Sequence, residues 1–407
     1  MSRGARMRTP ENQPRVVLCT ADVGCGHARA ATAILLALRG LRPDLRPVIV
    51  EALSCAPRWF NHLYRDTYLA AVKHAPRLNG WLYDRMDVFG TPAYRGVVSL
   101  IEVFALRSFC DGDEIVQADL IICTHFLCAR VLSRLRQRGH LRAKLAVVVT
   151  DHHPHAVWRV SQADLNFVAS DAAADEMLRN GIDAHKIVVT GIPVDARFDI
   201  AMSQAEARFR QQLPNVPILL LTGGGLGLGG LEHALEGALA SEGEHYAVVV
   251  CGHNQTLRTR LLHRFGNSPR CRILGVTTKM HELMAAADLL VGKPGGMTST
   301  EAIARGLPMV LMKPIPGQEQ RNADILMQAN AAIGHTDPFA AGQAAAALLR
   351  QPDKLQQMRS CVSGLQKSGS ARGIADAALN LCEGCGTPRT NGWSDDRVRR
   401  FNGQAVG

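Results

Sequence analysis

"DLLVGKPGGMTSTEAIARGLPMVLMKP", residues 288–314, is the stretch that decides the fold. An apolar strand runs into a turn that holds Gly295 and Gly296, and a helical pattern then leads to a second apolar strand. Strand, glycine turn, helix and strand form the unit of a doubly wound parallel sheet. Glycines after the strand also let the backbone approach a ligand closely. The stretch therefore predicts an α/β domain with a ligand site at the turn.

The same rhythm runs through the rest of the chain. Residues 14–40, "PRVVLCTADVGCGHARAATAILLALRG", again read as strand, glycine loop and helix. Further strands are expected at 47–53, 118–124, 144–151, 165–170, 186–191, 218–222, 246–252 and 271–276. The rhythm breaks between residues 197 and 215. We expect two Rossmann-like domains, residues 1–200 and 201–382, that face each other across a cleft, and a poorly ordered tail at 383–407.

Composition narrows the class of protein. The 407 residues are 47% hydrophobic and 20% charged, which is typical of globular proteins. No apolar run reaches the ~18–20 residues of a membrane span, and residues 1–15 lack the apolar core of a secretory signal. Eleven scattered cysteines favour reduced thiols in the cytoplasm. Cys382 and Cys385 stand close together, but the two further ligands of a zinc site are missing nearby, so no metal is expected.

Charge is unevenly placed. The net charge is +10, and the first 150 residues hold 21 Lys and Arg against 12 Asp and Glu. Nearly all of the excess therefore lies in the first domain. A basic surface indicates an anionic partner, which leaves nucleic acid, anionic lipid and a phosphorylated substrate open.

Residues 57–90 combine aromatic and basic side chains. This segment holds seven of the 20 aromatic residues of the chain. They are Trp59, Phe60, Tyr64, Tyr68, Trp81, Tyr83 and Phe89, interleaved with Arg58, Arg65, Lys73, Arg77 and Arg85. Such a mixture favours docking on a membrane interface, with aromatic side chains inserted. A helical insertion that buries its aromatics in a core is the alternative; RNA could also meet this composition, although no RNA-binding motif accompanies it.

A second glycine loop opens the second domain. "LLLTGGGLGLGG", residues 219–230, places Gly224 and Gly225 between a strand and a helix. Exposed backbone N–H groups beside a helix N-terminus suit a diphosphate, whereas the plainer alternative is a tight turn. No Gly-Lys-Ser/Thr follows, so the loop is not a P-loop.

Polar side chains cluster after the strands of the second domain. Thr298 can offer its hydroxyl to phosphate, and Glu301 is suited to hold a ribose diol or, alternatively, to complement the helix dipole. Gln318, Glu319 and Asn322 follow the next strand. Amides and carboxylates there can bind sugar hydroxyls, because each hydroxyl both donates and accepts.

At this point the sequence resembles a known family. "KPGGMTSTEAIARGLPMVLMKPIPGQEQRNADIL", residues 293–326, is similar to the nucleotide-sugar signature of the monogalactosyl- and processive glucosyl-diacylglycerol synthases, GT-B glycosyltransferases of family 28. The words "GCGHARAA", "VVVTDHHPHAVW" and "VTGIPVDARF" follow in the family's order, and the resemblance extends over residues 15–375. It is longest and most specific in the second domain.

The resemblance implies an activity. The protein would transfer galactose or glucose from a UDP-sugar to diacylglycerol with inversion, without a bound metal, at the cytoplasmic face of a membrane. The first domain would bind the acceptor and the membrane, and the second would bind the UDP-sugar. Another lipid or polyprenyl acceptor, and a UDP-sugar sensor without turnover, are the alternatives.

The resemblance also implies roles for individual residues. Glu301 would hold the ribose, while Gly224, Gly225, Gly295, Gly296 and Thr298 would surround the diphosphate. Val276 and Thr277 would lie against uracil, and Gln318, Glu319 and Asn322 would hold the sugar.

The acceptor hydroxyl needs a general base. His27, directly after the glycine turn, is the leading candidate, although it could merely stand at a helix start. Asp151 and His155 lie in "TDHHPHAVW" at another strand end; His155 is a second candidate for the base and Asp151 could orient one. His125 is expected on the acceptor side.

Overall fold

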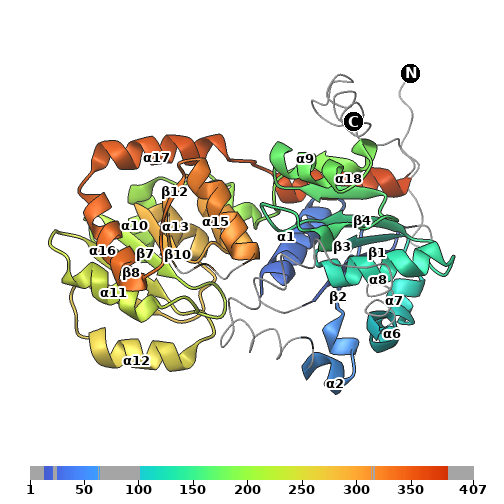
Figure 1. Cartoon of the computed structure of the whole chain (residues 1–407), viewed down its shortest axis with the longest axis horizontal. Coiled ribbons are helices and arrows are strands. Elements are labelled where there is room, and N and C mark those ends of the chain that lie inside the picture. The colour runs from blue at the N-terminus through green and yellow to red at the C-terminus, as the bar shows by residue number, and fades with distance from the viewer. Residues whose placement is uncertain are drawn as a thin grey trace.

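The computed structural model describes residues 13–21, 25–62, 64, 101–312, 314 and 317–383. Two α/β lobes lie side by side (Figure 1), each built on a parallel sheet of six strands. This confirms the predicted GT-B architecture of two doubly wound domains. The inner strands of both sheets are buried almost throughout, as expected where helices cover both faces of a parallel sheet, whereas the edge strands of each sheet are only partly buried.

The first sheet has the strand order β2-β1-β3-β4-β5-β6. Its strands are β1 (Val16–Thr20), β2 (Val48–Glu51), β3 (Leu120–Cys123), β4 (Lys144–Val148), β5 (Leu165–Val168) and β6 (Ile187–Val189). The described helices of this part are α1 (Gly26–Leu41), α2 (Arg58–Asn61), α6 (Arg107–Cys110), α7 (Asp113–Val116), α8 (Phe126–Gln137) and α9 (Asp171–Arg179), with short 3₁₀ turns η2 (Leu53–Cys55), η4 (Ala156–Trp158), η5 (Ala184–Lys186) and η6 (Ala196–Phe198).

The second sheet has the order β12-β11-β10-β7-β8-β9. Its strands are β7 (Ile218–Thr222), β8 (Tyr246–Val250), β9 (Cys271–Leu274), β10 (Leu289–Gly292), β11 (Met309–Met312) and β12 (Ala332–His335). The helices are α10 (Gln204–Gln211), α11 (Leu231–Ala240), α12 (Gln255–Phe265), α13 (Met280–Ala286), α14 (Gly296–Ala304), α15 (Gln318–Gln328), α16 (Pro338–Leu349), α17 (Pro352–Gly364) and α18 (Ser370–Glu383).

Register brings the functional loops together. In the first sheet Cys19 pairs with Cys123, and Cys123 pairs with Val147, so the loops after β1, β3 and β4 leave the same edge. In the second sheet Thr222 pairs with Gly292, which places the glycine loops after β7 and β10 next to each other. Ligands of open α/β sheets bind at such carboxyl edges.

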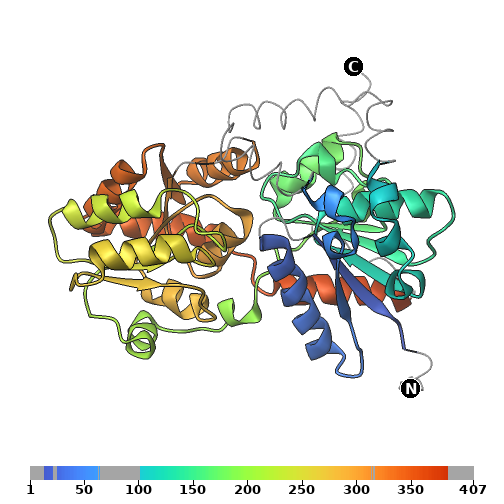
Figure 2. The same cartoon turned by 90° about the horizontal axis from the view of Figure 1, so that it is seen from below.

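The last helix crosses back to the first lobe. The expected second domain ends at residue 382, but α18 packs against α1, β3 and β4 (Figures 1 and 2). Ile374 and Ala378 are fully buried in a core shared with Leu18 and Ile34. Burying an aliphatic side chain of this size contributes about 1.5–3 kcal/mol, which explains why this amphipathic helix docks on that face.

Candidate active site

His27, the second residue of α1, is held by two threonines at strand ends. Its Nδ1 lies 2.9 Å from the carbonyl oxygen of Thr124 and 2.8 Å from the hydroxyl of Thr150. A carbonyl oxygen only accepts hydrogen bonds, so Nδ1 carries the proton and Nε2 carries the lone pair. A general base needs this tautomer. The geometry is that required of the predicted base, and neither threonine was recognised from the sequence.

Two aromatic side chains, His125 and Trp158, lie close to the His27 ring. The ring of His125 lies edge-on at a centroid distance of 4.4 Å, and that of Trp158 lies 6.3 Å away. His125 is buried, and its Nδ1 accepts the Leu127 N–H at 3.1 Å. Burial, with a smaller effect of His27, holds the pKa of His125 well below its usual value. The His27 ring therefore contacts an uncharged His125 ring.

Asp151 and His155, the other two candidates for the chemistry, are both buried. The Nδ1 of His155 accepts the Val157 N–H at 3.1 Å and so caps a 3₁₀ turn. One oxygen of Asp151 accepts the indole N–H of Trp158 at 2.9 Å, and the other accepts an amide N–H of Gln318 from the second domain. Their catalytic roles stay predictions, whereas the contact with Gln318 links the domains directly.

The two glycine loops of the second domain meet the first domain closely. A Cβ on Gly225 would lie 3.0 Å from the Cβ of Cys25, and one on Gly296 would lie 2.4 Å from the carbonyl oxygen of Thr150. A side chain at Gly296 would therefore collide with the backbone of the other domain. Glycine there permits domain contact, in addition to the close ligand approach expected from the sequence.

Phosphate-binding candidates gather at the same place. Gly224 has φ +69°, and a Cβ on it would lie 3.9 Å from the hydroxyl oxygen of Thr298. Gly295 precedes the first residue of α14, and a Cβ there would meet nothing within 4 Å. Thr298 lies in the first turn of that helix. The N–H groups and positive end of α14 thus point to the region where both glycine loops end.

Glu301 lies one turn further along α14 and is only 2% exposed. It forms an ion pair with Arg29, which comes from α1 of the first domain. The buried carboxylate therefore has a charged partner, and its expected ribose site lies at the boundary between the domains. No feature of the sequence pointed to Arg29.

The three residues expected to hold the sugar lie at the start of α15. The side-chain oxygen of Asn322 accepts the His152 N–H at 3.1 Å, and its amide donates to the Pro294 carbonyl at 3.2 Å. Glu319 pairs with Lys293 at 2.7 Å. Together with Gln318, these side chains are grouped beside Asp151 and the turn after β10, so the structure brings the predicted polar cluster together.

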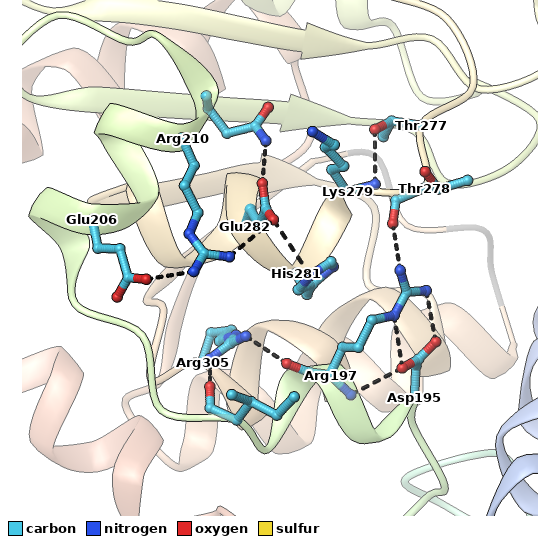
Figure 3. A network of polar contacts seen from close by, with 12 residues as sticks. Asp195, Arg197, Glu206, Arg210, Thr277, Thr278, Lys279, His281, Glu282 and Arg305 are labelled. Carbon is cyan, nitrogen blue, oxygen red and sulfur yellow. Dashed lines mark hydrogen bonds and ion pairs between the residues drawn. The ribbon is translucent and has the colours of Figure 1, made fainter.

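The loop expected to contact uracil is held by the linker between the domains, the segment that contains Asp195, Arg197 and Ile200. Val276 is 57% exposed, and the hydroxyl of Thr277 accepts the Lys279 N–H at 3.0 Å. Figure 3 shows Arg197 of the linker pairing with Asp195 and donating to the carbonyl of Thr278 at 3.0 Å. The hydrogen bond from Arg197 holds the pKa of Asp195 below its usual value.

The same linker is tied to the helix that carries Glu301. The guanidinium of Arg305, directly after α14, donates to the carbonyls of Arg197 and Ile200 at 2.6 Å each (Figure 3). The linker thus contacts both α14 and the loop that was expected to meet uracil.

His152 forms a further bond between the domains. Its Nε2 lies 2.9 Å from the hydroxyl of Ser299 on α14. Burial lowers the pKa of His152 from 6.5 to about 4. Between these two values an opened interface binds a proton at His152 and the closed interface does not. Closure should therefore lose stability as the pH falls below about 6.5, with no further loss below about 4.

Small-angle X-ray scattering can measure this opening. Between pH 7.5 and pH 5 we expect the radius of gyration to rise in the parent protein and to change much less in His152→Gln, which cannot take a proton. His263→Gln, on the exposed side of α12, is the matched control and should open like the parent. Equal opening of His152→Gln and the parent would show that His152 does not set the pH response.

The segment expected to meet a membrane lies mostly outside the described residues. The aromatic and basic residues of this segment that lie outside the described residues are Tyr68, Trp81, Tyr83, Phe89, Arg65, Lys73, Arg77 and Arg85. Trp59 is 48% exposed, as expected, but the prediction that Phe60 inserts into lipid is wrong. Phe60, on α2, is 3% exposed because it packs into the core and stacks on Tyr64 at a centroid distance of 5.5 Å. Two exposed side chains, Phe104 at 71% and Val116 at 65%, were missed from the sequence.

Two features are absent from the described ranges, which have gaps. No group of three or more His, Cys, Asp or Glu in them is arranged to hold a metal ion, and Cys385 lies beyond them. No helix in the same part of the chain is long and apolar enough to cross a membrane.

Two family models match the chain. The model described as monogalactosyldiacylglycerol (MGDG) synthase matches residues 27–194, and the model described as UDP-N-acetylglucosamine 2-epimerase matches residues 155–379. A processive diacylglycerol beta-glucosyltransferase of Staphylococcus aureus (strain JH9) is 28% identical over 315 residues, which are 76% of this chain and 78% of the relative.

Solved structures share the two-lobed fold. A co-structure of Staphylococcus aureus MnaA with UDP has a TM-score of 0.61 at 13% identity and covers 93% of this chain and 100% of its own. MurG of Acinetobacter baumannii has a TM-score of 0.56 at 18% identity, over 90% of this chain and 100% of its own. The chain belongs to the monogalactosyldiacylglycerol synthase and processive diacylglycerol glucosyltransferase family of GT-B glycosyltransferases, and from residue 155 onward it also carries the domain of the UDP-N-acetylglucosamine 2-epimerase family.

Proposed function

We propose that the protein transfers galactose or glucose from a UDP-sugar to diacylglycerol, with inversion, to give a β-glycosyldiacylglycerol. The observation that carries the proposal is the place of His27. Its base tautomer is fixed at the edge of the first sheet, and the preceding residue, Gly26, lies against Met297 of α14, where a Cβ would meet that side chain at 3.3 Å. A base of the acceptor domain thus stands beside the donor helix.

The reaction needs one displacement at the anomeric carbon. The lipid hydroxyl oxygen forms a bond to C1 of the sugar, its proton passes to Nε2 of His27, and the bond from C1 to the UDP oxygen breaks. Attack opposite to the leaving group turns an α-linked donor into a β-glycoside. The developing charge on UDP is stabilised by backbone N–H groups and the positive end of α14.

The donor would span the edge of the second sheet. We assign the ribose to Glu301, the diphosphate to the two glycine loops with Thr298, and uracil to the loop at Val276 and Thr277. Gln318, Glu319 and Asn322 would bind the hexose hydroxyls, with Asp151 beside them. Asp151 and His155 remain the alternatives to His27 as participants in proton transfer.

The acceptor is a lipid, so we place the protein at a membrane surface, on the cytoplasmic side. Support comes from the basic first domain and from apolar side chains exposed on it. Trp59 on α2 and Phe104, which precedes α6, are both exposed, and α2 and α6 lie near each other in both views (Figures 1 and 2). Arg58 and Arg107 lie beside them.

Binding to vesicles should have two parts. Basic residues near an anionic surface contribute about 1 kcal/mol each, screened within ~8 Å at physiological salt, whereas inserted aromatics act independently of salt. In flotation assays we expect binding that rises with anionic lipid and falls, but not to zero, with added salt. Trp59→Ala with Phe104→Ala should lower the salt-resistant fraction, and Arg58→Gln with Arg107→Gln the salt-sensitive one.

Phe209 offers a matched control for the aromatic pair. It is 85% exposed on α10 of the second domain, and Phe209→Ala should leave flotation unchanged. The parent protein staying in solution with anionic vesicles at low salt would refute membrane docking, and a soluble acceptor would then be the better assignment.

Epimerisation of a UDP-sugar is a second candidate function, favoured by the epimerase model that matches residues 155–379. That match includes none of α1, on which His27 lies. Release of UDP separates the candidates when it is measured with UDP-glucose, UDP-galactose and UDP-N-acetylglucosamine, with and without diacylglycerol vesicles. Glycosyl transfer requires UDP release that depends on the lipid. An epimerase would change the sugar of UDP-N-acetylglucosamine equally well without lipid.

A further inference from the structure

Arg29 bridges the two domains at the centre of the donor site. It lies on α1, two residues after His27, and its guanidinium pairs with Glu301 of α14. The Arg29 side chain is 42% exposed while that of Glu301 is 2% exposed. Glu301 is thus reached from the open side of the site by an arginine of the acceptor domain.

The guanidinium lies close to the place assigned to the diphosphate. Thr298 precedes Glu301 by three residues, and side chains at that spacing on a helix lie on one face, about 5–6 Å apart at Cβ. The loop at Gly225 lies against Cys25, the residue before α1, so closely that a Cβ on Gly225 would stand 3.0 Å from the Cβ of Cys25. The starts of α1 and α14 and the glycine loop therefore lie near the Arg29–Glu301 pair.

A ribose diol and Arg29 would compete for the same carboxylate. Glu301 is buried, and the more exposed guanidinium of Arg29 covers its Oε1 on the open side, from which a ribose diol would have to reach the carboxylate. A guanidinium that leaves a buried carboxylate loses a strong partner unless another anion replaces it. A diphosphate is such an anion, because arginine binds phosphate oxygens through two parallel hydrogen bonds.

We propose that Arg29 is a donor-responsive switch that moves from Glu301 to the diphosphate when a UDP-sugar binds. This inference rests on the proposed function, in which Glu301 takes the ribose. Ribose hydroxyls replace the guanidinium at Glu301, and the released guanidinium binds the phosphate oxygens. The site then rejects uridine, which displaces Arg29 without offering it an anion, and accepts UDP, which does both.

The movement of Arg29 to the diphosphate would also favour the departure of UDP. Negative charge on the UDP oxygen grows as its bond to C1 breaks, and a guanidinium on the diphosphate stabilises that charge. Arg29 and His27 belong to the same turn of α1, so one element delivers the base and the cation. When UDP leaves, Arg29 returns to Glu301.

Calorimetry with uridine and UDP tests the switch without using activity. In Arg29→Ala we expect UDP to bind about tenfold more weakly, because a charge-assisted contact is lost, and uridine to bind up to about tenfold more tightly, because nothing has to be displaced from Glu301. Arg29→Lys keeps the charge without the paired geometry and should give a UDP affinity between those of the parent and Arg29→Ala. Arg39→Ala, exposed in the last turn of the same helix, is the matched control and should change neither affinity.

The calorimetry distinguishes failure of the proposed switch from failure of the assigned donor site. Uridine and UDP affinities that shift by the same factor in Arg29→Ala, or do not shift at all, would overturn the switch while leaving the UDP site intact. Failure of the parent protein to bind UDP would overturn the assigned donor site, and the switch with it. Circular dichroism of each variant verifies that it is folded.

Discussion

Replacing His27 with Ala is expected to lower turnover by ~10²–10⁴-fold and to leave the affinity for UDP nearly unchanged. This is the usual effect of removing a general base. The ring is held by Thr124 and Thr150 through Nδ1, so Nε2 is the nitrogen that would accept the proton of the lipid hydroxyl, while the other domain would hold the donor. The loss should appear in kcat, measured by UDP release with saturating UDP-sugar and diacylglycerol vesicles.

Thr150 allows a finer form of this test. Thr150→Ser keeps the hydroxyl that lies 2.8 Å from Nδ1 and should retain most of the activity, whereas Thr150→Val removes it and should lower kcat. His140→Ala, exposed after α8, is the control for loss of an imidazole. A His27→Ala enzyme with nearly the parent's turnover would show that His27 is structural, and Asp151 and His155 would be tested next.

Replacing Glu301 with Ala should weaken UDP binding by roughly 10- to 100-fold, about 1.5–3 kcal/mol, through the loss of charge-assisted hydrogen bonds to the ribose. Glu301 is 2% exposed, so water replaces those bonds poorly. Calorimetry gives the affinity, and Glu301→Gln, which keeps the shape and one acceptor oxygen, should lie between Ala and the parent. Glu244→Ala, an exposed carboxylate of the same domain, should have no effect. An unchanged UDP affinity in folded Glu301→Ala would remove the ribose from this residue.

Much of the fold could be predicted from local patterns. Apolar runs such as Ile218–Thr222 become fully buried strands, and glycines after them mark the turns into helices. The return of α18 to the first lobe could not be predicted, because the apolar stripe of a helix does not indicate which lobe will bury it. Strand β12 was missed for a related reason: of Ala332–His335 only Ala332 is fully buried, so no apolar run marks it.

The candidate site, like the fold, has features that could be predicted from the sequence and features that could not. Residues in the first two turns of helices that follow strands, such as Glu301 on α14 and Asn322 on α15, could be expected at the sheet edge from the sequence. Their partners lie on the other domain: Arg29 for Glu301, and the backbone of His152 for Asn322. A contact between residues 272 positions apart leaves no local pattern in the chain. The buried state of Phe60 was mispredicted because composition cannot tell an aromatic in a core from one facing lipid.

Incubation with UDP-glucose or UDP-galactose and vesicles that contain diacylglycerol, followed by identification of the lipid product, tests the proposed transfer most directly. Mass spectrometry should show diacylglycerol that carries a hexose, formed only when donor, lipid and active protein are all present, and the proton spectrum should show a β-linked anomeric position. His27→Ala should form little of it. Absence of any glycosylated lipid with both donors, from a protein that binds UDP and the vesicles, would contradict transfer to diacylglycerol.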